Sequence, residues 1–185
     1  MWFGFLPIFV RYVNSLPGGD VPGFGKWQAI GRQSKWFALV LKGRESDTGI
    51  VVHEATHVMH WYLCFFVTLA LWVLLGALLT VDIGWTADAP AHAVMSLEDA
   101  ALILTAPALL TSIYMHGLLY RTVRAYRRWT EVGAFAVQSK AYVEDNSPEK
   151  VQARMELFAS FLTLPVYDLQ ITAIEAYELI RERLR

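Results

Sequence analysis

Residues 49–81 read GIVVHEATHVMHWYLCFFVTLALWVLLGALLTV, so an HExxH motif leads directly into a long apolar segment. On a helix, His53 and His57 lie one turn apart on the same face, which is the spacing that two imidazoles need to bind one zinc ion. Glu54 lies beside that face, where its carboxylate can accept a proton from a water molecule that the metal activates. The motif indicates a zinc hydrolase, although five letters alone leave a chance match equally open.

The apolar segment belongs to a chain that is unusually apolar throughout. Of 185 residues, 55% are hydrophobic and only 18% are charged, which is atypical of a soluble domain. Trp61–Val81 and Ala100–Tyr120 each contain 21 residues without an Asp, Glu, Lys or Arg. Each is long enough to cross a hydrocarbon core about 30 Å thick as a helix. We therefore predict a mainly α membrane protein with a two-helix transmembrane hairpin; two core helices of a soluble α protein are the alternative.

The distribution of charge predicts how this hairpin is oriented. Residues 82–99 contain four acidic residues and no lysine or arginine, whereas all 16 basic residues lie before residue 45 or after residue 120. By the positive-inside rule, the connecting loop faces away from the cytoplasm, and both termini and the HExxH motif are cytoplasmic. The net charge of −1 and the lack of a basic patch interleaved with aromatic residues argue against nucleic acid as a partner. The single cysteine, Cys64, excludes an intrachain disulfide.

The segments on either side of the hairpin are expected to form a small cytoplasmic part. Met1–Val10 is apolar but too short to span a bilayer, and it lacks the basic start and the cleavage site of a signal peptide. We expect it to lie in the membrane interface or to pack against the cytoplasmic part. Asn14–Gly25 is a turn-rich loop, and Trp36–Lys42 is the best strand candidate. That strand could offer its edge to an extended peptide or could simply be buried.

The C-terminal half is expected to be helical. The second span is predicted to continue past Tyr120, through four arginines, as one helix that reaches Gln138; these arginines are interpreted as anchors at the cytoplasmic membrane surface. Pro148 is expected to begin a helix that ends near Leu162, and Val166–Leu184 is expected to form a last amphipathic helix. The predicted organisation is a single domain, 1–185, with an interfacial and strand region (1–48), the HExxH helix and first span (49–81), an outer loop (82–99), the second span and third-ligand helix (100–144), and a helical cap (147–185).

A hydrolytic zinc site usually has three protein ligands and one open position, so a third ligand is needed. A hairpin returns the chain to the same membrane surface, and helix rise then places Glu131 within about one turn of the level of the two imidazoles. By the same count Glu144 lies too far from the membrane, and Glu98 and Asp99 lie on its opposite side. Glu175 and Glu178 remain second choices for the third ligand, and both can be interpreted as part of a solvated face of the last helix.

The two motifs together resemble a known group of enzymes. His53-Glu54-x-x-His57, a helix entering the membrane, a second span and Glu131-x-x-Ala134 are similar to the HtpX-like membrane metalloproteases and the related CAAX prenyl endopeptidases, over about residues 36–140. These are zincins whose third ligand is the glutamate of an ExxA(D) motif. The resemblance implies Zn²⁺ held by His53, His57 and Glu131, with Glu54 as the general base, in a zincin-like cytoplasmic part.

The chain departs from this pattern in two respects. Phe135 stands where those families usually have an acidic residue, so the contact expected of that residue is missing or is supplied from elsewhere. Only two spans are present, so relatives with more spans are not a guide to its substrate channel. Membership of one of the small HExxH groups of phages and bacteria, whose activity is only inferred, is a further possibility.

Other polar residues near the motifs have competing interpretations. His60 and His116 are interpreted as structural, the second because it lies one turn from the end of a span. His92 lies in the outer loop and cannot reach the site. Gln138 and Tyr142 follow Glu131 at helical spacings, and either could donate a hydrogen bond to an oxyanion. We choose Tyr142 as the predicted donor.

These observations lead to a functional hypothesis and an alternative. The hypothesis is a zinc-dependent endopeptidase that hydrolyses a peptide or protein substrate at the cytoplasmic face of the membrane. Its expected partners are the lipid bilayer and that substrate, and a homo-oligomer or a membrane complex is a further possible partner. The alternative is a non-catalytic membrane scaffold or assembly protein with a structural or vestigial metal site.

Overall fold

The computed structural model describes all residues except 1, 4–5, 17–30, 35, 85–96 and 144–146. Among the described residues the chain is mainly helical, with five helices, a short two-stranded pairing of β1 (Trp2–Phe3) with β2 (Leu6–Pro7), and a three-stranded sheet. It divides into two compact units, Met1–Trp61 with Leu119–Arg185, and Tyr62–Leu118. Most of the predicted turn-rich loop and residues 85–96 of the predicted outer loop lie outside the described residues. The ends of that outer loop, residues 82–84 and 97–99, are helical.

The three-stranded sheet belongs to the first unit. It comprises β3 (Phe9–Val13), β4 (Gly31–Ser34) and β5 (Phe37–Leu41) in the order β3-β5-β4, with β3 parallel and β4 antiparallel to β5. The predicted strand at Trp36–Lys42 is confirmed by β5, in which the alternate residues Ala38 and Val40 are fully buried. The suggestion that this strand offers a free edge is wrong, because both of its sides are hydrogen-bonded to neighbouring strands. Among the described strands of this sheet, β3 and β4 are the outer ones.

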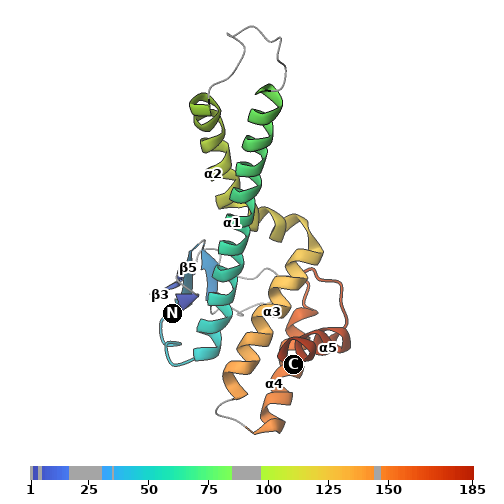
Figure 1. Cartoon of the computed structure of the whole chain (residues 1–185). Helices are drawn as coiled ribbons and strands as arrows, with labels where there is room; N and C mark the ends of the chain where they lie inside the picture. The colour runs from blue at the N-terminus through green and yellow to red at the C-terminus, as the bar shows by residue number, and fades with distance from the viewer. Residues whose placement is uncertain (1, 4–5, 17–30, 35, 85–96, 144–146) are drawn as a thin grey trace. The chain divides into compact units, whose positions relative to one another are not determined.

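Helix α1 (Thr48–Gly84) contains both the HExxH motif and the first apolar segment. Asp47 accepts a hydrogen bond from the backbone N–H of Ile50 at 3.2 Å, which satisfies one of the donors at the start of the helix. No break interrupts the helix for 37 residues, which confirms the predicted single helix. His53 and His57 therefore lie on the first part of α1, which belongs to the first unit, and the helix itself continues into the second unit (Figure 1).

The second unit is a pair of apolar helical segments, from α1 and from α2 (Leu97–Thr122). Thr48–Leu78 and Ile103–Thr122 are long and apolar enough to cross a membrane. Trp72 Nε1 donates to Thr111 Oγ1 at 2.6 Å, which links the two helices by a polar contact. Large apolar side chains point away from the pair on both helices, at residues Leu71, Val73, Leu74, Leu78, Ile103, Leu110 and Leu118. Such an apolar outer surface is typical of helices that face lipid.

The helix after the second apolar segment is interrupted, contrary to the prediction of one continuous helix. α2 ends at Thr122 and α3 (Arg124–Val143) begins after Val123. No glycine or proline marks this interruption in the sequence. Instead Arg127 donates to the backbone carbonyl oxygens of Tyr120 and Arg121, each at 2.7 Å, and so binds the carbonyls at the end of α2.

Three helices of the first unit, α3, α4 and α5, pack around one apolar core (Figure 1). The prediction for Pro148–Leu162 is confirmed by α4. The prediction of a helix over Val166–Leu184 is wrong at its start, because α5 covers only Ala173–Leu184. Its first turn is closed by a capping box between Thr172 and Glu175. The core residues are Val132, Phe135, Ala136, Met155, Phe158, Ala159, Leu162, Leu169, Ala176 and Ile180.

Candidate metal centre

Three side chains from two helices of the first unit meet at one buried point. His53 and His57 come from one face of α1, and Glu131 comes from the second turn of α3. The two Nε2 atoms are 3.3 Å apart, His57 Nε2 is 3.6 Å from Glu131 Oε1, and His53 Nε2 is 4.0 Å from Glu131 Oε2. All three residues are at most 9% exposed. The structure thus brings together the three residues that the sequence predicted as metal ligands.

The spacing of these donor atoms fits a tetrahedral metal ion. Ligand atoms about 2.0–2.1 Å from a tetrahedral ion lie about 3.3 Å from one another, and the observed separations are 3.3, 3.6 and 4.0 Å. Two imidazole nitrogens and one carboxylate oxygen form a donor set that holds a metal ion and leaves one position open. The buried His53, His57 and Glu131 group could therefore hold a metal ion.

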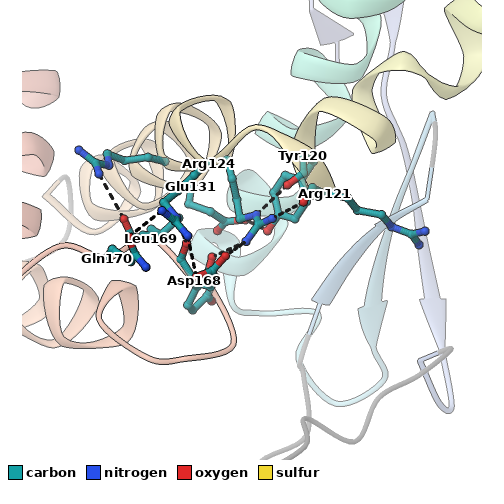
Figure 2. A network of polar contacts seen from close by, with 10 residues as sticks. Tyr120, Arg121, Arg124, Glu131, Asp168, Leu169 and Gln170 are labelled. Atoms are coloured by element: carbon teal, nitrogen blue, oxygen red, sulfur yellow. Dashed lines mark hydrogen bonds and ion pairs between the residues drawn. The ribbon is translucent and has the colours of Figure 1, made fainter.

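Glu131 is the most buried member of the group, and its surroundings fix its orientation. Burial raises the pKa of the Glu131 carboxyl to about 7, while the Tyr120 hydrogen bond and the Arg127 charge act in the opposite direction. The Tyr120 hydroxyl donates to Glu131 Oε1 (Figure 2). A cation between the two imidazoles would favour the ionised carboxylate in this apolar setting. Tyr120 therefore orients the third ligand.

The role of Tyr120 was missed by the sequence analysis, which treated it only as an interfacial aromatic residue. Tyr120 and Glu131 are eleven residues apart, which on one straight helix separates their backbones by about 16 Å. The interruption at Val123 makes their contact possible. Because nothing in the local sequence signals that interruption, periodicity could not have revealed this pair.

Glu54 is buried beside the two histidines and lies against the backbone of β4. A Cβ atom placed on Gly31 would come within 2.6 Å of both Glu54 Cγ and Glu54 Oε1. Only glycine allows the strand to approach the glutamate this closely. β4 therefore acts as a wall that limits the positions available to the Glu54 carboxylate.

Gly31→Ala tests this wall, because its methyl group requires the Glu54 side chain to move. We expect Gly31→Ala to lower the free energy of unfolding by about 1–3 kcal/mol, because the added methyl group overpacks the contact with Glu54. The apparent thermal midpoint of the detergent-solubilised chain measures this change. Gly117→Ala is the matched control, because a Cβ there meets no atom within 4 Å. Equal thermal midpoints of the two variants would show that Gly31 does not contact Glu54 in solution.

Phe135, which departs from the ExxA(D) pattern, contacts the metal group directly. Its ring packs against the His53 ring at a centroid distance of 4.5 Å and an interplanar angle of 68°. His53 Nδ1 is buried and has no hydrogen-bond partner among the described residues. Phe135 thus orients His53 by packing, where metal-bound histidines usually donate their second N–H to a polar partner.

Tyr142 contacts the start of α1, and its predicted role as oxyanion donor stays a prediction. The Tyr142 hydroxyl donates to Asp47 Oδ1 at 2.6 Å, at the start of α1. Its ring lies so close to Gly49 that a Cβ atom there would come within 2.3 Å of the ring. Gln138, the other residue considered, is buried and interacts with the His53 ring. Tyr142 therefore links α3 to the first turn of α1.

Tyr142→Phe is expected to lower the free energy of unfolding by about 1 kcal/mol, because a hydrogen bond to a carboxylate at a partly buried site is lost. The apparent thermal midpoint of the detergent-solubilised chain measures this change. A double-mutant cycle with Asp47→Ala is the control, and the two losses should be less than additive. Full additivity would show that the two side chains do not interact in solution.

The remaining candidates lie outside the metal group. His60 is buried against Trp129, with ring centroids 4.4 Å apart, and His116 is buried in the second unit. Glu175 belongs to the capping box of α5, and Glu178 pairs with Arg181, so neither second-choice ligand reaches the group. His92 and Glu144 lie outside the described residues.

Models of protein families, curated proteins and solved structures were compared with this chain, and none matches it. The function must therefore be argued from the site itself.

Proposed function

We propose that this protein is a membrane-anchored zinc metallopeptidase of the zincin type, which hydrolyses peptide bonds at the cytoplasmic face of the membrane. The spacing of His53 Nε2, His57 Nε2 and the Glu131 carboxylate supports this proposal most strongly. Two imidazoles and one carboxylate with an open fourth position are typical of hydrolytic zinc sites, whereas structural zinc sites usually have four protein ligands. The position of Glu54 within the HExxH motif adds a base next to the ion.

The proposed reaction assigns a task to each side chain. A zinc ion bound by His53, His57 and Glu131 would act as a Lewis acid that lowers the pKa of water and polarises a carbonyl group. Glu54 accepts a proton from the attacking water as the new C–O bond forms, and the carbonyl π electrons move to oxygen. Glu54 then delivers that proton to the amine nitrogen as the C–N bond breaks. Tyr120 holds the Glu131 carboxylate in place.

The arrangement of α1 supports a reaction at the membrane surface. The helix that carries both histidines continues into an apolar segment that is long enough to cross a membrane. The basic residues near both ends of the hairpin favour a cytoplasmic site by the positive-inside rule. β4, which lies next to Glu54 and ends the order of the described three-stranded sheet, is suited to pairing with an extended peptide.

Zinc content and peptidase activity of the purified full-length chain test this proposal together. We expect about one zinc ion per chain, three protein ligands by X-ray absorption at the zinc edge, and cleavage of fluorescein-labelled casein. Removal of zinc with 1,10-phenanthroline should stop cleavage, and added Zn²⁺ should restore it. Four protein ligands, or zinc without cleavage, would favour a scaffold with a structural metal site, and a lack of bound metal would contradict the peptidase and favour a scaffold with a vestigial site.

A further inference from the structure

The segment between α4 and α5 carries a second tyrosine to the site. We call residues Val166–Ile171 the strap. The backbone of the strap is unusual, because Asp168 and Gln170 have positive φ angles of 48° and 52°. Left-handed conformations at residues other than glycine cost free energy and persist only where surrounding contacts impose them. Between these two residues, the Leu169 side chain is 1% exposed and lies in the apolar core.

Three arginines of α3 hold the strap in this conformation by hydrogen bonds, some of which are drawn in Figure 2. Arg124 Nε donates to the Asp168 carbonyl oxygen at 3.1 Å, and Arg128 Nη2 donates to the Leu169 carbonyl oxygen at 3.2 Å. Arg124 Nη1 also donates to Gln170 Oε1 at 2.6 Å. The sequence analysis interpreted these arginines as membrane anchors, but their donors bind the strap.

Arg127 links the strap to the residue that orients Glu131. One of its nitrogens, Nη1, donates to the Tyr167 carbonyl oxygen at 3.1 Å and to Asp168 Oδ2 at 3.2 Å. Its Nε donates to the Tyr120 carbonyl oxygen, and its guanidinium lies 5.6 Å from the centre of the Tyr120 ring. One side chain therefore fixes the backbone at both Tyr120 and Tyr167.

The Tyr167 ring contacts the aromatic residue that packs against His53. This ring packs against Phe135 at a centroid distance of 6.1 Å, and Phe135 in turn packs against His53. Burial raises the pKa of the Tyr167 hydroxyl, and the charges of Glu131 and Glu54 raise it further. Among the described residues, none accepts a hydrogen bond from this hydroxyl, in contrast to those of Tyr120 and Tyr142.

We propose that Tyr167 is a catalytic residue whose hydroxyl donates a hydrogen bond to the carbonyl oxygen of the substrate as that oxygen becomes an oxyanion. This inference rests on the proposed peptidase function. The geometry that supports it is a phenol whose backbone is held by Arg127 and whose ring packs against Phe135, the residue that contacts the His53 ring. Tyr167 keeps its proton throughout, because its hydroxyl donates a hydrogen bond and transfers no proton. The strap thus completes a site whose other groups lie on α1 and α3.

Tyr167→Phe tests the inference, because it removes only the hydroxyl and keeps the packed ring. We expect kcat for casein cleavage to fall about 100-fold with little change in KM, which is the usual effect of losing one oxyanion donor. Zinc content and thermal midpoint should stay at the wild-type values. Tyr177→Phe is the matched control, because Tyr177 packs against the same core on α5 and should keep wild-type kcat.

A binding measurement provides a readout that does not depend on turnover. The probe is a dipeptide phosphonamidate, whose tetrahedral anion mimics the oxyanion, titrated into the Co²⁺-substituted full-length chain and followed by visible absorption. We expect Tyr167→Phe to weaken binding about tenfold or more and Tyr177→Phe to leave it unchanged.

The outcomes separate the inference from the function on which it rests. If wild-type protein cleaves casein and Tyr167→Phe keeps kcat and probe affinity within about twofold, Tyr167 is not the donor and the peptidase function stands. If Tyr167→Phe loses zinc together with activity, its role is structural and the inference is overturned. If the zinc-loaded wild-type protein neither cleaves casein nor binds the probe, the peptidase function fails and the inference fails with it.

Discussion

Glu54→Gln is expected to abolish peptide hydrolysis and to leave about one zinc ion bound per chain. Glutamine has nearly the same shape as glutamate but cannot accept a proton from the attacking water, so general-base catalysis is lost. The variant should retain the contact with Gly31 and the three metal ligands. We expect kcat to fall by roughly 10³-fold, measured by casein cleavage, with zinc content measured by mass spectrometry on the same sample.

Glu45→Gln is the matched control, since this glutamate precedes α1 and accepts a hydrogen bond only from the nearby Gly43 backbone. It should cleave casein at the wild-type rate. Because both variants are purified in the same way, a difference between them also excludes a contaminating protease as the source of activity. Normal turnover by Glu54→Gln with zinc bound would show that another group acts as the base.

Much of this site could be predicted because its two histidines are close in sequence and lie on a helix that has no breaker. The spacing of His53 and His57 determines their common face, and the apolar residues that follow continue the same helix. The choice of Glu131 required a long-range argument, which used the length of the hairpin and the rise of a helix. The structure brings Glu131 to the two imidazoles, although α2 and α3 are separate helices.

The residues that support the site could not be predicted in the same way, because their positions depend on contacts between distant segments. The break at Val123 is stabilised by Arg127 donors, and the strap around Asp168 is held by arginines about forty residues earlier in the chain. The local sequence Val166–Leu184 is amphipathic and so predicts a helix from its start. Tertiary hydrogen bonds override that preference in the strap.

The N-terminal strand illustrates the same limit. Met1–Val10 was expected to lie in the membrane interface or to pack on the cytoplasmic part. The structure pairs residues 9–13, which overlap the end of that segment, with residues 37–41 as parallel strands. Parallel pairing depends on partners distant in sequence, so neither segment signals it alone. Gly31, whose missing side chain makes room for Glu54, was likewise invisible without knowledge of that packing.

Glu131→Ala is expected to release the metal, and this prediction tests the hairpin argument from which the third ligand was chosen. Two imidazoles alone hold zinc weakly, because the carboxylate supplies both a ligand atom and the negative charge that compensates a buried dication. We expect zinc affinity to fall about 100-fold or more, measured by competition with a fluorescent chelator. The thermal midpoint with zinc present should fall toward that of the metal-free wild type, because binding no longer stabilises the folded state.

Glu178→Ala is the matched control, because the sequence left Glu178 as a second choice for the third ligand and the structure pairs it with Arg181. It should bind zinc as tightly as the wild type, since removing an exposed ion pair affects neither imidazole. Glu131→Gln provides a finer test, because glutamine nearly preserves the volume next to Tyr120 but lacks the charge. If Glu131→Gln binds zinc weakly, the ion requires the negative charge at position 131. Full zinc occupancy in Glu131→Ala would show that Glu131 is not a ligand and would contradict the peptidase proposal.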